Sequence, residues 1–489
     1  MMRPTLLIAC CAVVVSGQDV QLAIMQRMSD LRTAEADCST VWANGTVGPT
    51  CWLTGVWQAI AATALVAVDD FNSRNGRYVP AFANLPNGCN KRLVPTVYDT
   101  GSTPKGAVND LFQMLSDGAP DAIVGPARSV VSMPTAIIAG VGYNIPQISY
   151  WSTSKKLSDK DDYPFFMRTI PSDHAVADAV CNFWSEEMGY TRAAIIHASD
   201  PYAQAYEESL VSQCRQNWRV EIDSFSFIEN GRAGNQESIV RAVTALKDLN
   251  LPATVVMLVA TDPGDVRDIL FEASNRGLTG VGSMWVHADH EMPTDGPLSP
   301  PVEGNIRILA VGGDNPRYTQ YVSTDFAAID HVRVNAALPA PFHVDSNFFT
   351  TFDAVNSPLI RDVATYEYDA VAAIGLLACE IAPTGPLPSD FGRLVWASKN
   401  SLSFRGLSGD SPGVRFLPNG DRDPGSASYN LYNFNIDGES GVGNETLRAQ
   451  FHGQSWNWTG GNREASGLRF GGGTTIAPAG TAASGHHTT

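Results

Sequence analysis

Residues Ile145 to Ser172 read IPQISYWSTSKKLSDKDDYPFFMRTIPS and form the most informative segment of the chain. The apolar beginning, Ile145 to Tyr150, predicts a short buried strand. The hydroxyl side chains of Ser152, Thr153 and Ser154 follow at once, where a parallel sheet presents its carboxyl edge. Open α/β sheets bind their ligands at that edge. The segment then continues into a second strand, so it predicts a ligand site beside two strands of one sheet.

Helical and strand patterns alternate on both sides of this segment. Alternation at such lengths is typical of βαβ units and of a parallel sheet. A chain of 489 residues suits two lobes of roughly 150 to 200 residues each. We therefore expect an α/β fold with two lobes, each a parallel sheet flanked by helices. The expected helices are 57–72, 105–116, 133–142, 175–187, 203–216, 236–249 and 264–275, and the expected strands are 93–98, 122–125, 192–197, 220–227, 254–260 and 282–287.

The last third of the chain completes the expected domain plan. A long apolar helix over residues 365–380 is expected to return to the first lobe. Two closing strands joined by a turn at Asn419-Gly420 follow within residues 401–437. Small residues then predominate, so we expect a flexible tail over 438–489. The expected ligand-binding region is 18–437, with lobe 1 at about 40–170 plus 365–400 and lobe 2 at about 171–364.

The N-terminal residues predict export. Residues 1–17, MMRPTLLIACCAVVVSG, carry one basic residue, an apolar run and small residues at the end, as a cleaved signal peptide does. The alternative is a membrane anchor, but the run is shorter than the roughly 20 residues of a spanning helix. The expected location is secreted or at the extracellular face of the plasma membrane. The net charge of −17, from 33 basic and 50 acidic residues, argues against nucleic acid as a partner.

Cysteines and glycosylation motifs agree with export. Six cysteines remain after residue 17, and six allow 15 pairings. We favour Cys51–Cys89, which brackets the first helix, and Cys181–Cys214, which joins two successive helices. Cys379 lies in an apolar run and is equally well explained as a free buried thiol. Three sites fit the N-glycosylation pattern Asn-x-Thr, namely Asn44, Asn444 and Asn457.

The chain resembles the type I periplasmic-binding, or Venus flytrap, ligand-binding regions of metabotropic glutamate, type-B GABA and natriuretic-peptide receptors. The resemblance rests on the amino-acid sequence of residues 145–172 and of the closing stretches 404–409, 414–422 and 429–435. It extends from about Trp57 to Asn435. The resemblance implies a small-molecule ligand bound between two closing lobes, in the ectodomain of a G-protein-coupled or guanylate-cyclase receptor. It also implies a possible homodimer through lobe 1 and a membrane-spanning signalling module that is missing from this chain.

Two loops are candidates for holding a carboxylate. The segment Gly125 to Ser129 follows a strand and begins a helix, where free backbone N–H groups and the helix dipole favour an anion. The resemblance assigns Ser129 and Thr153 to the α-carboxylate of an amino acid, with Arg128 and Ser152 beside them. The alternative interpretation is that these hydroxyls only cap helices.

Other candidates would face an ammonium group. The resemblance assigns Tyr202 to a ring that stacks on the ligand as a cation–π partner. It assigns Asp289, and more weakly Asp262, to an acidic position near the cleft. The alternatives are a buried tyrosine and solvated carboxylates.

Departures from the glutamate-receptor pattern bear on the ligand. Leu53 and Val363 stand near positions that are basic in those receptors, and Arg361 is the only basic residue close by. Glutamate itself is therefore not favoured. Trp151 replaces a small residue and would narrow the pocket or stack on an aromatic or aliphatic ligand. We expect an amino acid or a related amine.

Enzyme and metal chemistry have little support in the sequence. His287, Asp289, His290 and Glu291 are close in sequence, but successive residues on an extended segment point apart, so we expect no metal site. No Gly-x-Ser-x-Gly or His-Glu-x-x-His motif occurs, so we expect no enzyme and no cofactor. The main alternative to a receptor is a freely secreted solute-binding protein of the same fold, and a secreted hydrolase is less favoured.

Overall fold

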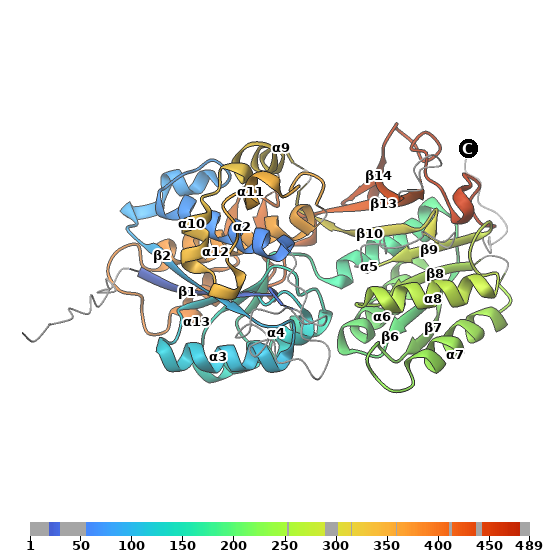
Figure 1. Ribbon diagram of the computed structural model, residues 1–489, viewed down its shortest axis with the longest axis horizontal. Helices are drawn as coiled ribbons and strands as arrows, with labels where there is room; N and C mark the ends of the chain where they lie inside the picture. The colour runs from blue at the N-terminus through green and yellow to red at the C-terminus, as the bar shows by residue number, and fades with distance from the viewer. Residues whose placement is uncertain are drawn as a thin grey trace, which may run out of the picture.

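A computed structural model shows two lobes lying side by side (Figure 1). It describes residues 19–29, 55–251, 254–288, 302–313, 315–357, 359–409, 413–436 and 443–479. The predicted signal peptide, Cys51, Asn44 and Leu53 lie outside these residues.

Lobe 1 is built on a five-stranded parallel sheet in the order β2-β1-β3-β4-β5. Strand β1 (Asp19–Gln26) lies between β2 and β3, so lobe 1 begins earlier than the expected residue 40. Apolar residues fill the sheet because helices cover it on both sides. The other strands are β2 (Arg92–Asp99), β3 (Ala122–Val124), β4 (Gln147–Ser149) and β5 (Phe166–Arg168), and the helices are α2 (Gly55–Asn72), α3 (Pro104–Gly118), α4 (Ser129–Ile137), α12 (Thr365–Ile381) and α13 (Phe391–Ser398).

Helix α12 lies at the centre of lobe 1. Every residue from Thr365 to Cys379 is buried, as its apolar composition on all sides predicts. It packs against α2, and a Cβ at Gly375 would come within 2.6 Å of the Phe71 ring. The close approach of the two helices therefore requires glycine at this position.

Lobe 2 contains an eight-stranded sheet in the order β15-β14-β13-β10-β9-β8-β6-β7. Strands β6 to β10 pair in parallel, whereas β13, β14 and β15 pair antiparallel. The α/β class is thus confirmed, with a mixed rather than a parallel second sheet. The strands are β6 (Arg192–Ala198), β7 (Glu221–Phe227), β8 (Thr254–Val259), β9 (Ser283–His287), β10 (Ile306–Val311), β13 (Ser428–Ile436), β14 (Gly443–His452) and β15 (Ser455–Trp458), and the helices are α5 (Asp173–Asn182), α6 (Pro201–Gln213), α7 (Asn235–Asp248) and α8 (Pro263–Asn275).

The expected flexible tail is wrong for residues 443–479. Strands β14 and β15 extend the sheet of lobe 2, and Trp456 is buried with its ring centroid 5.8 Å from that of Phe183. The sequence GNETLRAQFH of β14 is largely polar, since the strand lies near the edge of the sheet and exposes one face. Strands of this kind lack the apolar run that marks buried strands.

Three short helices that the sequence analysis did not predict lie in the range expected for lobe 2, but they belong to lobe 1. They are α9 (Pro316–Gln320), α10 (His331–Ala337) and α11 (Phe348–Thr351), and Figure 1 shows them beside α2 and α12. The hydroxyl groups of Tyr321 and Thr63 lie 2.6 Å apart, and the Gln58 amide donates to the Phe342 carbonyl at 2.9 Å. The boundary of lobe 2 at residue 364 was therefore placed too late.

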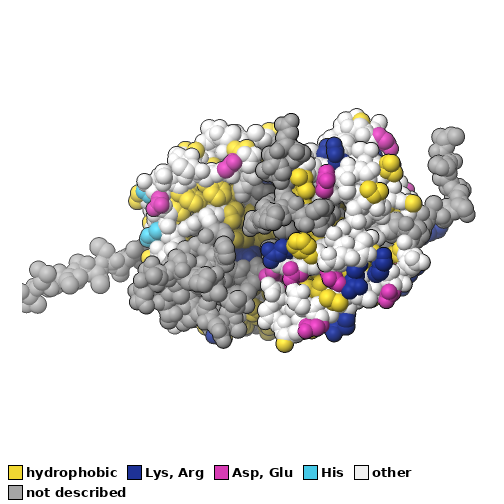
Figure 2. Space-filling view, turned by 45° about the vertical axis from the view of Figure 1, so that its right-hand side comes forward, with side chains coloured by type: hydrophobic (Ala, Val, Ile, Leu, Met, Phe, Trp, Pro, Cys, Tyr) yellow, Lys and Arg dark blue, Asp and Glu magenta, His cyan; other side chains and the backbone are white. Residues whose placement is uncertain are grey.

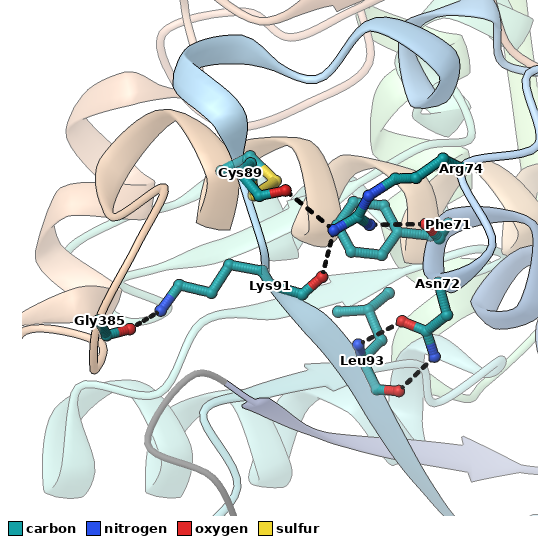
Figure 3. Close-up of a disulfide and its surroundings, with 8 residues drawn as sticks. Phe71, Asn72, Arg74, Cys89, Lys91, Leu93 and Gly385 are labelled. Carbon is teal, nitrogen blue, oxygen red and sulfur yellow. Dashed lines mark hydrogen bonds between the residues drawn. A yellow bond between two sulfur atoms is a disulfide. The ribbon is translucent and has the colours of Figure 1, made fainter.

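The disulfides correct one of the two expected pairs. Cys181–Cys214 joins α5 to the turn after α6, as expected. Cys89 pairs with Cys379, 290 residues away, and not with Cys51 (Figure 3). Cys379 is consequently not a free thiol. Beside this bond Arg74 donates to the carbonyls of Cys89 and Lys91, at 3.0 and 2.8 Å.

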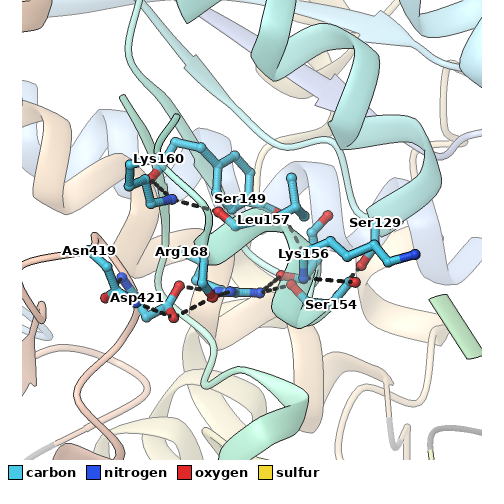
Figure 4. A network of polar contacts seen from close by, with 12 residues as sticks. Ser129, Ser149, Ser154, Lys156, Leu157, Lys160, Arg168, Asn419 and Asp421 are labelled. Atoms are coloured by element: carbon cyan, nitrogen blue, oxygen red, sulfur yellow. Dashed lines mark hydrogen bonds and ion pairs between the residues drawn. The ribbon is translucent and has the colours of Figure 1, made fainter. Parts of the chain in front are cut away.

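A buried ion pair holds the segments that cross between the lobes (Figure 4). Arg168, at the end of β5, is fully buried and its Nε lies 2.7 Å from Asp421 Oδ1. Its Nη1 also donates to the carbonyls of Ser152 and Ser154. Burial would raise the pKa of Asp421, but the Arg168 guanidinium and the Ser158 hydroxyl hold that pKa below its ordinary value. Asp421 follows Gly420, which has a φ of +76°, so the predicted turn at Asn419-Gly420 carries one partner of this pair.

The closing strands pair differently from the expected hairpin. Strand β12 (Val414–Arg415) pairs with β11 (Ser403–Phe404), whereas β13 pairs with β10 and β14.

Candidate ligand-binding cleft

Residues of both lobes enclose a small cavity between them. Lobe 1 contributes Trp151 and Thr153, and Ile170 comes from the crossing segment after β5. Lobe 2 and the segment before α12 contribute Asp173, Val176, Tyr202, Tyr206, Ala288, Leu309, Ala310 and Asp362. The cavity has a volume of about 20 Å³, which is room for a water molecule and little more. Figure 2 shows a hollow between the two halves of the molecule, with charged and apolar side chains at its rim.

The cavity lies at the carboxyl edges of the strands, where the segment 145–172 predicts a site. Trp151 and Thr153 follow β4, and Tyr202 follows β6 in lobe 2. Asp200 caps α6, since its Oδ1 accepts hydrogen bonds from the backbone N–H groups of Tyr202 and Ala203, at 2.8 and 3.2 Å. This cap fixes the first turn of α6 and with it the Tyr202 side chain.

The hydroxyl residues after β4 have different roles, because Ser152 holds two loops together and Thr153 lines the cavity. Ser152 is fully buried, and its hydroxyl lies within 3.1 Å of the carbonyls of Pro126 and Ala127 and 2.8 Å from the Ser132 hydroxyl. It therefore joins the loop after β3 to the loop after β4. Thr153 instead lines the cavity, and its carbonyl accepts a hydrogen bond from Asp173 N at 2.9 Å.

Ser129 and Arg128 lie close to this edge without lining the cavity. The Ser129 hydroxyl accepts a hydrogen bond from Ser154 N at 3.1 Å. Arg128 Nη1 donates to the Ser102 carbonyl of lobe 1 at 3.1 Å, and its Nη2 lies 3.5 Å from Thr261 Oγ1 of lobe 2. Arg128 thus bridges the two lobes at the rim of the cleft.

Of the two predicted aspartates, only Asp262 is among the described residues. Asp262 caps α8, because its Oδ1 accepts from Gly264 N at 2.8 Å, and it does not line the cavity. Asp289 lies outside the described residues, as do His290 and Glu291. His287 is buried, with its Nε2 3.0 Å from Asn305 Nδ2. Within the residues that the structure describes, no group of three or more His, Cys, Asp or Glu side chains could hold a metal ion.

Among the lining residues that were not predicted from the sequence, three carry polar or charged groups: Asp173, Tyr206 and Asp362. Asp173 directly follows the segment 145–172 and begins a helix at the cleft, so its position could have been noticed. Asp362 lies far along the chain, and its carboxylate pairs with Arg361 at 2.6 Å and with Arg307 at 3.7 Å. Only the tertiary structure brings it to the cavity.

Aromatic rings continue from the cavity into lobe 1. The Trp151 ring centroid lies 5.5 Å from that of Trp57, and the Arg27 guanidinium lies over Trp57 at 5.2 Å. Arg27 follows β1, and so a basic side chain reaches this wall from a part of the chain that the sequence analysis did not consider. The charged residues in the lining itself are both carboxylates, Asp173 and Asp362.

Asn457 is the one of the three predicted glycosylation sites whose side chain the structure describes, and it is exposed on β15. No helix in the described ranges is long and apolar enough to cross a bilayer.

Comparison with known proteins agrees with this geometry. A family model described as the receptor family ligand binding region matches residues 62–437. Metabotropic glutamate receptor-like protein E of Dictyostelium discoideum is 28% identical over 224 residues, covering 44% of this chain and 26% of that protein. The extracellular calcium-sensing receptor of Homo sapiens is 28% identical over 206 residues, covering 42% and 18%. Metabotropic glutamate receptor 6 of Rattus norvegicus is 27% identical over 207 residues, covering 42% and 23%. The matched segments thus span about a quarter or less of these relatives.

Proposed function

Because this chain belongs to the family of receptor ligand-binding regions, we propose that it is an extracellular sensor that binds an amino acid or a related amine by closure of its two lobes. The relatives named above are receptors and not enzymes, which supports a role in ligand binding. In this proposal the chain acts as the ectodomain of a receptor and works with a membrane-spanning signalling module.

The observation that carries the proposal is the convergence of Thr153, Asp173 and Tyr202 on one interlobe cavity. The Thr153 hydroxyl can donate a hydrogen bond to a carboxylate. The Asp173 carboxylate and the face of the Tyr202 ring both favour an ammonium group. One cavity is thus lined by a group that binds a carboxylate and by groups that bind an ammonium, as a zwitterion requires.

The rest of the lining favours an apolar ligand side chain. Ile170, Val176, Leu309 and Trp151 line the cavity, and none of the described lining residues is basic. A distal carboxylate such as that of glutamate would lie against this apolar wall and near Asp362. We therefore propose an amino acid or amine with an aliphatic or aromatic group.

Closure follows from the size of the cavity. An amino acid does not fit into about 20 Å³, so the ligand enters only after the lobes separate or the lining side chains rotate. Contacts between the lobes, such as Arg128 with Thr261, form only when the lobes meet. A ligand favours the closed state to the extent that it adds contacts there.

The test is thermal unfolding of the secreted chain in a panel of amino acids, amines and small carboxylates. A ligand that binds the folded state stabilises it by about 2.7 kcal/mol at 100 times its Kd, which raises the unfolding temperature. Asp173→Asn and Thr153→Val should abolish the shift, while the exposed matched controls Asp248→Asn and Thr350→Val should retain it. A shift that survives both cleft substitutions would place the ligand elsewhere. No shift across the panel would refute a small amine ligand and favour a peptide or protein ligand.

Lobe 1 also presents an apolar surface that supports a homodimer. Phe112 of α3 is 55% exposed, and Val141 and Tyr143, which follow α4, are 63% and 50% exposed. Apolar patches of this kind commonly mark protein interfaces. Analytical ultracentrifugation should show a dimer that Phe112→Ser with Val141→Ser converts to a monomer, and a monomeric wild-type chain would refute it.

A freely secreted solute-binding protein remains the second candidate function. The same cleft would serve it, because ligand binding by closure does not require an output. Expression of the native gene product in cells distinguishes the two: retention at the cell surface supports the receptor, and quantitative release into the medium supports the secreted protein.

A further inference from the structure

A second cavity, of about 500 Å³, lies beside the segments that cross between the lobes. This volume is within the range of small-molecule sites, whereas the cavity in the cleft is far smaller. Its walls come from three parts of the molecule. Lys155 and Ser158 belong to lobe 1, Asp178 and Phe451 belong to lobe 2, and Asn419 belongs to the crossing turn.

Two buried polar atoms on lining residues have no hydrogen-bond partner within the described part of the chain. One is the hydroxyl of Tyr429, a side chain that is 4% exposed, and the other is His174 Nδ1. Buried polar groups in folded proteins nearly always have a partner. Both residues border the cavity, so a small rotation of either side chain would turn its unpartnered atom toward the cavity contents.

Both orphan groups are hydrogen-bond donors. The Gln213 amide nitrogen donates to His174 Nε2 at 2.5 Å, which leaves the imidazole proton on Nδ1. Burial and the nearby Lys155 lower the pKa of His174, so the neutral ring prevails. Burial raises the pKa of Tyr429, so its phenol keeps its proton. A ligand here must therefore offer acceptor oxygens.

The charges around the cavity indicate a neutral ligand. Asp421 is neutralised by Arg168 and bonded to Ser158 and Asn419. Arg422 is fully buried, and its nitrogens donate to four oxygens of neighbouring residues. The remaining charged side chains are one of each sign, Lys155 and Asp178. Lys155 and Asp178 have opposite signs, and the Arg422 donors are engaged within the protein, so the lining does not favour an anion or a cation over a neutral ligand.

The other lining groups suit hydroxyl-rich molecules. Asn217, Gln213 and Asn419 carry amides, each of which already makes a hydrogen bond within the protein and has capacity for a further one. Asp178 accepts from Trp218 Nε1 through Oδ1, and its other oxygen can accept from a ligand. The rings of Tyr429 and Phe451, 6.2 Å apart, add apolar surface for the C–H faces of a sugar ring. Lys155 and Asn217 are exposed, so the cavity opens to solvent.

We propose that this cavity is a second ligand site, which binds a neutral polyhydroxylated molecule of the monosaccharide class. The walls of this cavity belong to both lobes, so a change in the angle between the lobes changes the distance between opposite walls. A ligand that fits one angle better than the other shifts the lobe equilibrium, and its binding is coupled to binding in the cleft. This coupling rests on the proposed function, whereas binding in the second cavity does not.

Isothermal titration calorimetry of the full secreted chain with glucose, galactose, mannose and inositol tests the binding. We expect saturable heat with at least one of them. Tyr429→Phe removes a hydroxyl, and Asp178→Asn replaces an acceptor oxygen by an amide nitrogen, both at nearly constant shape. Each should weaken binding about tenfold, as loss of one hydrogen bond does. The control Tyr98→Phe, on β2 of lobe 1 and outside the cavity lining, should bind like the wild type. Asn217→Ala at the exposed rim provides a third variant with little risk to folding.

No heat with any of the four probes overturns the proposal, as does binding that all three cavity variants leave unchanged. Coupling is tested by repeating the amino-acid titration in saturating sugar, where we expect the same fold-change in affinity in both directions. Equal affinities with and without sugar overturn the coupling. Amino-acid binding without sugar binding refutes the second site alone, and sugar binding without amino-acid binding refutes the proposed function alone.

Discussion

The two described disulfides should stabilise the protein unequally, because they close loops of very different length. Cys89–Cys379 spans 290 residues and Cys181–Cys214 spans 33. In the chain-entropy relation, the long loop contributes about 5.7 kcal/mol at 25 °C and the short loop about 3.7 kcal/mol. Replacing both cysteines of the long loop by alanine should therefore lower the free energy of unfolding by about 2 kcal/mol more than replacing both of the short loop.

The four cysteines provide a matched comparison, since each is buried with at most 7% exposure, so the loss of packing is similar in both variants. Urea unfolding followed by tryptophan fluorescence, with the reduced wild type as a further control, measures the difference. A variant without Cys181–Cys214 that is as unstable as one without Cys89–Cys379 would refute the assignment of the difference to loop entropy. It would mean that packing around each bond outweighs the constraint on the unfolded chain.

Three further predictions concern the buried charges and the C-terminal strands. Asp421→Asn leaves Arg168 buried without a counter-charge and should lower the free energy of unfolding by about 3 to 5 kcal/mol. Adding Arg168→Met should restore part of this loss. If urea titrations show that the losses from the two substitutions simply add, the coupling is contradicted. Burial and the nearby Asp99 raise the pKa of Asp110 to about 7, so the folded state binds this proton more tightly than the unfolded state, and stability should fall as the pH rises from about 4 to 7. Asp110→Asn should flatten this part of the stability profile, and an unchanged profile would exclude Asp110 as its source. Truncation after residue 437 removes β14 and β15 and uncovers apolar side chains of lobe 2, so the shortened chain should bind the dye ANS and unfold at a lower temperature, whereas a chain ending at 479 should not.

Local patterns predicted most of the helices and strands. The alternation of apolar strands with amphipathic helices is visible in any short window, because burial of one face imposes a period on the sequence. Thr153 could be placed at the ligand-binding edge of the first sheet for the same reason, since ligands bind at the carboxyl ends of parallel strands. Tyr202 was assigned to the cleft by the family resemblance. Cys181–Cys214 also depends on two neighbouring helices and was predictable.

Contacts between distant segments were not predictable in this way. Cys89 pairs with Cys379 because α12 returns to the first lobe in a position that no local pattern specifies. Strands β14 and β15 carry mostly polar residues, since they lie at the edge of a sheet that other strands complete. Asp362 lines the cleft only because the chain passes the cleft just before it enters α12.

The sequence by itself determined most of the helices and strands, the α/β class and the edge of the first sheet where Thr153 lines the cleft, since these follow from hydrophobic periodicity and from residues close together in the chain. The tertiary structure alone decided which lobe holds α9 to α11, which cysteine pairs with Cys89, and how both lobes wall the second cavity. The physical reason is that such contacts depend on the complementary surfaces of segments hundreds of residues apart. Periodicity within a segment shows which face is buried, but not what covers it.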